Sequence, residues 1–254
     1  METKYYRVAD TRTRLRSVVH SVGLVVAAFV FGTLLYLSAG SLFQAAGYAV
    51  EDTASLPPLP YAVLTATQFV GFFAVIGFYI QFERDDDLFS ADVPSLRDAA
   101  WVVAGFVGLF AVAAALTAAL RSIGVDTATN QVITQGQQDP VRFLYLIPVT
   151  LLFVAPAEEL LFRGLVQGLF RRAYGAVPAV LFASVLFGAP HYFALLGSDG
   201  SIGPKLAVIA VLGVVLGTLY EVTENLAVPI LVHGCWNAFS FVSQYAEATG
   251  LLGV

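Results

Sequence analysis

The chain has 254 residues, of which 58% are hydrophobic and only 12% charged, whereas soluble domains average about 25% charged residues. This composition, with a mean hydropathy of +0.78, excludes an ordinary soluble domain and favours a polytopic membrane protein. The net charge of −5 and the scattered basic residues do not indicate a nucleic-acid partner, and the single cysteine, Cys235, excludes an intramolecular disulfide framework.

The first apolar run follows a basic N-terminal tail. This run, at 18–37, has the roughly 20 residues that a membrane span needs and exceeds the about 7–15 of a signal-peptide core. Basic residues before a first span usually mark the cytoplasmic side. We therefore expect a retained span at about 17–37 and a cytoplasmic N-terminus. The basic residues of the tail are Lys4, Arg7, Arg12, Arg14 and Arg16.

Two further spans are expected at about 61–82 and 99–120. The loop before the second span is rich in proline, which cannot continue a helix. The segment 83–98 is acidic, contains Pro94 and is expected to be a surface loop. The linker after the third span is rich in Gln and Asn, and such a polar segment is not expected inside the hydrocarbon layer.

The fourth span is unusually long. Its helical pattern covers 141–172, about 45 Å at the rise of an α-helix, and Pro156 should kink it near the middle. Three more spans are expected at about 176–195, 202–220 and 226–245. The predicted fold class is therefore all-α, a polytopic transmembrane helix bundle of about seven spans. With the N-terminus inside, the pair Arg171 and Arg172 falls on the cytoplasmic side.

Span four places three charged residues, Glu158, Glu159 and Arg163, where a charge costs about 3 kcal/mol at the bilayer centre. Glu159 and Arg163 are four residues apart, so they share a helix face and can form an ion pair. Glu158 is rotated by about 100° from Glu159 and must face a different neighbour. One carboxylate is therefore expected to be paired and the other free to face a polar cavity.

Two of the three histidines also lie in predicted spans. His191 follows Phe187 by four residues in span five, and His233 precedes Asn237 by four residues in span seven. A carboxylate and an imidazole can together hold a water molecule and accept its proton. A second imidazole and an amide can donate hydrogen bonds to a developing oxyanion. Such a set is sufficient for peptide hydrolysis without a serine or cysteine nucleophile.

These residues also form three motifs in order. Glu158 to Arg163 resembles the EExxxR motif of the CAAX-protease/bacteriocin-processing family, Phe187 to His191 its FxxxH motif, and His233 to Asn237 its HxxxN motif. The resemblance covers about 141–245, which would be the catalytic core. The N-terminal tail and first three spans, 1–140, and a C-terminal tail, 246–254, show only generic features.

The resemblance implies an intramembrane endopeptidase, and we expect no cofactor and no metal. By it, Glu158 and His191 activate water, His233 and Asn237 form the oxyanion hole, and Glu159 and Arg163 support the site. Phe187 would line the substrate groove. The expected partners are membrane lipid and a peptide or protein substrate at the membrane, with or without a lipid modification. The expected location is the plasma membrane.

Three alternatives stay open at this point. Two histidines and a glutamate are the ligand set of some zinc peptidases, which would make this a zinc-dependent membrane peptidase of the same fold. Buried ionisable residues also mark ion or proton pathways in membranes. A non-proteolytic binding or scaffold protein could carry the same motifs.

Two pairs of glycines are each spaced by four residues, Gly164 with Gly168 and Gly213 with Gly217. Small residues at this spacing let helix backbones approach closely in lipid, although ordinary helix glycines fit equally well. The third histidine, His20, has no partner that the sequence identifies.

Overall fold

The structure is a computed structural model that describes residues 5–83 and 88–251. Within these ranges every regular secondary-structure element is a helix. The only β-type pairing among the described residues is an isolated bridge between Thr127 and Ser201. Lys4 and the acidic run 85–87 lie outside the described residues.

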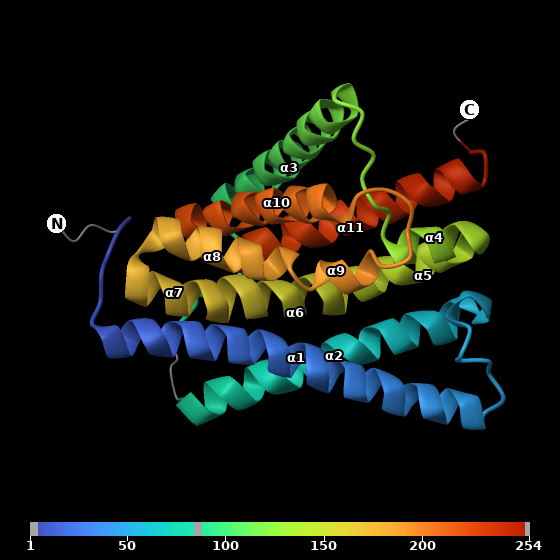
Figure 1. Cartoon of the computed structure of the whole chain (residues 1–254), viewed down its shortest axis with the longest axis horizontal. Coiled ribbons are helices and arrows are strands. Elements are labelled where there is room, and N and C mark those ends of the chain that lie inside the picture. Colours follow the sequence, from blue (N-terminus) through green and yellow to red (C-terminus); the bar gives the residue numbers. More distant parts are fainter. Residues whose placement is uncertain (1–4, 84–87, 252–254) are drawn as a thin grey trace.

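The helices follow the predicted spans closely (Figure 1). The long helices outside span four are α1 (Thr11–Ala45), α2 (Pro58–Glu83), α3 (Leu96–Ser122), α8 (Ala176–Gly188), α10 (Ile202–Thr223) and α11 (Ala227–Ala248). Two short helices, α4 (Gln131–Gln138) and α9 (His191–Ala194), lie in the connections.

Span four is one rod over Val141–Tyr174, but it is not a uniform α-helix. It consists of α5 (Val141–Val149), α6 (Ala155–Glu159) and α7 (Gln167–Tyr174), joined by π-helical segments at Thr150–Val154 and Leu160–Val166. Pro148 and Pro156 each lack a backbone N–H, so the regular hydrogen-bond ladder is interrupted near them. The sequence predicted a kink at Pro156, and what the structure has near it is π-helical turns on both sides of α6, a feature often found at functional sites.

Six helical stretches are long and apolar enough to cross a membrane. The helix α11 is not among them, although its 22 residues give sufficient length. Polar residues such as His233, Asn237 and Gln244 lower its apolar character. The all-α transmembrane bundle is thus confirmed, and α11 accounts for the seventh predicted span.

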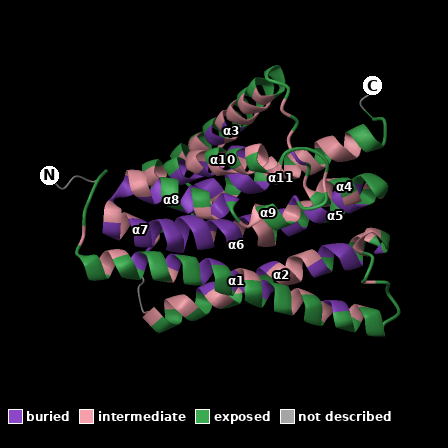
Figure 2. Ribbon diagram, in the orientation of Figure 1, coloured by how far each residue is buried: buried purple, intermediate pink, exposed green. Residues whose placement is uncertain are grey.

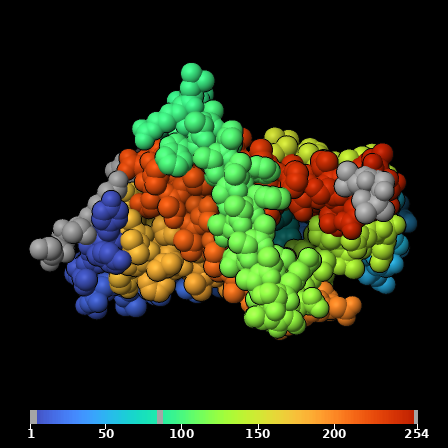
Figure 3. All heavy atoms as spheres, turned by 90° about the horizontal axis from the view of Figure 1, so that it is seen from above, coloured from blue at the N-terminus to red at the C-terminus, as the bar shows by residue number. Residues whose placement is uncertain are grey.

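The rod of α5, α6 and α7 lies at the centre of the bundle (Figure 1). The α1–α2 pair packs against one side of it, and α8 and α11 pack against the other side. The helix α10 packs on α8 and α11 and reaches the rod through hydrogen bonds from Arg163 and Gln167. Buried residues are concentrated along the rod (Figure 2). The helix α3 lies across the outside of α10 and α11 (Figure 3). Consequently, the polar residues of span four lie in the interior of the bundle.

The segment 83–98, expected to be a surface loop, is exposed and without regular structure over residues 90–95, but its residues 88 and 89 are folded onto the bundle. Leu88 is buried, and Phe89 packs against Gly164 of span four. The Leu226 backbone N–H donates to the Ser90 carbonyl at 2.9 Å. These contacts arise because the acidic run is followed by apolar residues that the bundle can bury.

The N-terminal tail lies along the turn between α7 and α8. The Arg7 N–H donates to the Tyr174 carbonyl at 2.9 Å, and the Val177 N–H donates to the Tyr5 carbonyl at 3.1 Å. Gly175, with φ of 86°, permits this approach, since a Cβ there would lie 2.6 Å from the Tyr5 oxygen. The basic tail therefore lies at the same end of the bundle as Arg171, as the predicted topology requires.

Candidate active site

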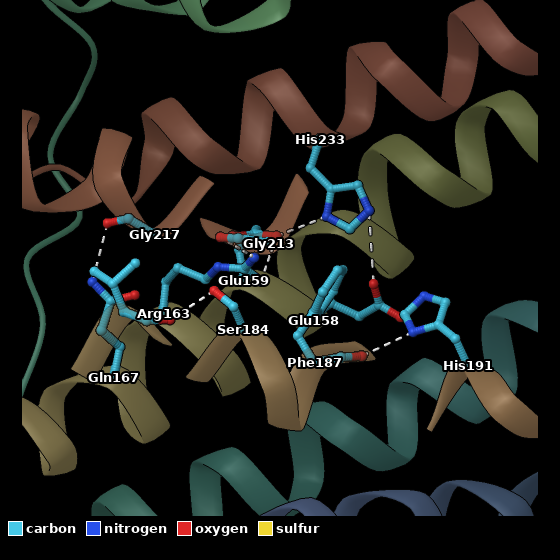
Figure 4. Close-up of polar contacts among 11 residues, drawn as sticks. Glu158, Glu159, Arg163, Gln167, Ser184, Phe187, His191, Gly213, Gly217 and His233 are labelled. Atoms are coloured by element: carbon cyan, nitrogen blue, oxygen red, sulfur yellow. Dashed lines mark hydrogen bonds and ion pairs between the residues drawn. The ribbon is translucent and has the colours of Figure 1, made fainter. Parts of the chain in front are cut away.

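The structure brings the motif residues of three spans together inside the bundle (Figure 4). Glu158 and Glu159 come from α6, His191 from the start of α9, and His233 from α11. Arg163 lies in the π-helical segment after α6. Glu159 and Arg163 are 0% exposed, and Glu158 is 8% exposed. Such burial is costly for charged groups unless they are paired or functional.

The predicted ion pair is present. Arg163 Nη1 lies 3.2 Å from Glu159 Oε1, and Arg163 Nη2 donates to the Gly213 carbonyl of α10 at 3.1 Å. The guanidinium also lies over the Phe187 ring at 4.4 Å. Arg163 therefore joins span four to both α8 and α10.

Glu159 has a second partner that the sequence did not predict. His233 Nδ1 lies 2.8 Å from Glu159 Oε1. An ionised carboxylate only accepts hydrogen bonds, so His233 carries a proton on Nδ1. This contact orients the imidazole so that its other nitrogen, Nε2, faces Glu158 Oε2 at 3.7 Å. His233 thus lies between the two adjacent glutamates.

His191 is oriented by the backbone of its own motif. The helix α8 ends at Gly188, and Pro190 begins the short turn that becomes α9. His191 Nδ1 lies 2.9 Å from the Phe187 carbonyl. Because a carbonyl can only accept, Nδ1 carries a proton, so Nε2 is the nitrogen that has the lone pair in the neutral form of the ring. In Figure 4 the Glu158 side chain points into the space between His191 and His233.

Phe187 packs among the polar groups of the site. Its ring centroid lies 5.0 Å from that of His191 and 5.9 Å from that of His233, and the residue is 4% exposed. It also contacts Phe162 edge to face at 5.2 Å. These contacts hold the two histidines and Arg163 in place. Its predicted role in lining the substrate groove stays a prediction.

Asn237 lies one turn after His233 on α11. Its Nδ2 donates to the Thr150 hydroxyl at 3.0 Å. Thr150 is 1% exposed and begins the first π-helical segment of span four. The sequence analysis missed Thr150, although an isolated hydroxyl within an apolar run was a weak signal. The second amide hydrogen of Asn237 stays available for another acceptor.

Gln167 is a further polar residue of span four, and His20 is the third histidine of the chain. Gln167, which the sequence analysis also missed, is buried and bonds to α10; its place four residues after Arg163 was the available signal. His20 lies on α1, away from the motifs, with Nδ1 2.9 Å from the Tyr79 hydroxyl. Within the described ranges, no group of three or more His, Cys, Asp and Glu side chains is arranged to hold a metal ion.

Comparison with protein families gives a match over residues 140–239 to the model described as type II CAAX prenyl endopeptidase Rce1-like. This segment, about two fifths of the chain, is similar to the Rce1-like family. The Rce1-like segment contains all six polar motif residues and Phe187, and it begins where span four begins. Searches of curated proteins and of solved structures gave no match.

Proposed function

We propose that this chain is an intramembrane endopeptidase in which glutamate and histidine activate a water molecule. The observation that carries the proposal is the position of Glu158, buried inside a membrane-spanning rod and pointing between two histidines from separate helices. A buried carboxylate without an arginine partner is costly, and such residues usually serve function in membrane proteins. The similarity of residues 140–239 to the Rce1-like family supports protease activity in general.

In the proposed reaction, Glu158 and the unprotonated Nε2 of His191 hold the water molecule. Glu158 takes one proton from it as the oxygen attacks the carbonyl carbon of the scissile peptide. The oxyanion accepts hydrogen bonds from Asn237 and from Nε2 of His233 in its doubly protonated form. Glu158 then gives the proton to the leaving nitrogen as the carbon–nitrogen bond breaks. Water is consumed, and one carboxyl and one amine product are released.

The substrate in this proposal is a peptide segment at the membrane, and CAAX-type tails are the class that the family description suggests. We further propose a plasma-membrane location with the basic N-terminal tail in the cytoplasm. The tail and the turn after α7 lie at one end of the bundle, in agreement with a shared cytoplasmic side.

A cleavage assay tests the proposal. Purified wild-type protein in detergent is incubated with a panel of matched peptides, with and without a C-terminal lipid, and the products are identified by mass spectrometry. We expect the wild-type protein to cleave at least one membrane-associated peptide, and Glu158→Gln to cleave it about 10²–10⁴-fold more slowly. Equal cleavage by the two proteins would show that the activity comes from a contaminant or another site. Absence of cleavage with proton flux into liposomes would favour the ion-pathway alternative.

A further inference from the structure

The interface between span four and α10 holds a line of polar side chains that the proposed reaction does not use in full. Glu159, Arg163, Gln167 and Arg171 follow one another at intervals of four residues. The first two are 0% exposed and Gln167 is 1% exposed, whereas the Arg171 side chain is 36% exposed. The line therefore leads from the candidate active site to the end of the bundle where the basic tail lies.

Glycines of α10 allow this line to form. Arg163 donates to the Gly213 carbonyl, and Gln167 Nε2 donates to the Gly217 carbonyl at 3.1 Å (Figure 4). A methyl group at Gly217 would lie 2.8 Å from Gln167 Oε1, which is too close. Methyl groups at Gly213 and Gly217 would also meet Ser184 and Val180 of α8, so the spacing of these glycines brings α10 close to α8 and leaves both carbonyls within reach of side chains from span four.

Gln167 contacts α10 at two points. Besides the Gly217 carbonyl, Nε2 donates to Glu221 Oε1 at 2.9 Å. Glu221 in turn lies 3.3 Å from Arg171 Nε through its other oxygen. Both amide hydrogens of Gln167 are therefore engaged by α10, and the two contacts join span four to α10 one turn after Arg163.

We propose that Gln167 is a positioning residue of the site, acting through Arg163 and Glu159 on His233. By fixing α10 against span four, it keeps the Gly213 carbonyl on Arg163. Arg163 in turn holds Glu159, and the same oxygen of Glu159 accepts from His233 Nδ1. Charge-assisted hydrogen bonds of this kind are strong and directional, so a displacement at one end changes the geometry at the other. The expected effect on turnover rests on the proposed peptidase function, whereas the effect on His233 does not.

Nitrogen NMR of histidine rings tests this directly, because the chain has only three histidines. The histidine-ring ¹⁵N spectra of the labelled wild-type protein and of Gln167→Leu are compared. The His233 signals are assigned as those that disappear in His233→Gln. The leucine removes both hydrogen bonds at similar volume. We expect the His233 Nδ1 signal to move beyond its linewidth while His20 stays unchanged, and turnover to fall by up to about 10²-fold, as for a small misplacement of reacting groups.

The matched control is Gln137→Leu, which removes an exposed glutamine bonded to Gln244 at 3.1 Å. It should leave His233 and turnover unchanged. A second variant, Gly217→Ala, pushes Gln167 away from α10 without altering Gln167 itself. Its control is Gly203→Ala on the same helix, where an added methyl group meets no atom within 4 Å. Gly217→Ala should move the His233 signal in the same way, and Gly203→Ala should not.

The outcomes separate the two proposals. A folded Gln167→Leu protein with an unchanged His233 signal overturns the positioning role, whatever its turnover. If Gln167→Leu does not fold, Gly217→Ala decides, and an unchanged His233 signal there overturns the role equally. If the wild-type protein cleaves no peptide, the proposed function is contradicted. If the His233 signal is nevertheless displaced in Gln167→Leu and Gly217→Ala, the positioning role is still supported.

Discussion

His233 Nδ1 lies 2.8 Å from Glu159 Oε1, so the second glutamate of the first motif directly contacts the histidine of the third motif. The same oxygen also lies 3.2 Å from Arg163 Nη1. Glu159 therefore connects a buried cation to the imidazole that faces Glu158. Its role extends beyond the ion pair that the four-residue spacing predicts.

This double contact gives the first prediction, which concerns Glu159→Gln. The amide oxygen can still accept from His233, but the negative charge opposite Arg163 is lost in a buried site, where breaking a pair is strongly destabilising. We expect a mixed defect, with a lower melting temperature and a lower turnover. Thermal unfolding and the cleavage assay on the same preparation measure the two effects. A variant with wild-type stability and no turnover would instead assign Glu159 directly to the chemistry.

The second prediction concerns Arg163→Ala. Removing this fully buried guanidinium leaves Glu159 unpaired, which costs about 3–5 kcal/mol. The partly exposed pair of Arg16 with Glu83 provides a matched control, since such pairs contribute about 0–1 kcal/mol. Denaturant or thermal unfolding in detergent should therefore show a clearly larger loss of stability for Arg163→Ala than for Arg16→Ala. Equal stability of the two variants would argue that the buried pair is absent in solution.

Local patterns predicted the helices well. Apolar run length located seven long helical stretches, six of which are apolar enough to cross a membrane, and helix periodicity separated the environments of Glu158 and Glu159. Spacing within one helix also predicted the pairing of Glu159 with Arg163. These features depend on interactions close in the sequence, for which periodicity is informative.

Contacts between distant segments were not predictable in the same way. The hydrogen bond of Glu159 with His233 joins residues 74 positions apart, and that of Asn237 with Thr150 joins residues 87 apart. Such contacts depend on how the spans pack, which periodicity does not report. The inward fold of Leu88 was missed for the same reason, since the neighbouring charges suggested exposure.

The third prediction is that activity survives strong chelation. The proposed site has a carboxylate, two imidazoles and an amide, which are sufficient to activate water and to stabilise an oxyanion. Turnover is measured after incubation with an excess of EDTA and dialysis, beside a zinc peptidase as a positive control for metal removal. Loss of activity in the chelator, with recovery on addition of zinc, would support the zinc-dependent alternative.

The fourth prediction concerns topology. In a Cys235→Ser background, Val8→Cys places a single thiol on the exposed N-terminal tail, and Leu251→Cys places one just after α11. With seven crossings and a cytoplasmic N-terminus, an impermeant maleimide should label Leu251→Cys in intact cells. It should label Val8→Cys only after the cells are permeabilised. Labelling of Val8→Cys in intact cells would contradict the predicted orientation and place the N-terminus outside.

The last prediction separates the two glutamates by the chemistry of Glu158. This residue faces His233 Nε2 at 3.7 Å, and Leu161 and Phe162 occupy the positions three and four residues later, so its own helix offers no basic partner. Glu158→Gln keeps the size of the side chain but cannot accept a proton from water. We expect turnover to fall by about 10²–10⁴-fold, the usual contribution of a general base.

Because Glu158 is not part of the Arg163 ion pair, the same variant should keep its melting temperature and its affinity for substrate peptide. Turnover, thermal unfolding and peptide binding are compared for wild type, Glu158→Gln and Glu159→Gln. Of the two variants, only Glu159→Gln should lose stability, because Glu159 forms the ion pair with Arg163. Near-normal turnover in Glu158→Gln, together with an inactive but well-folded Glu159→Gln, would move the role of general base to Glu159.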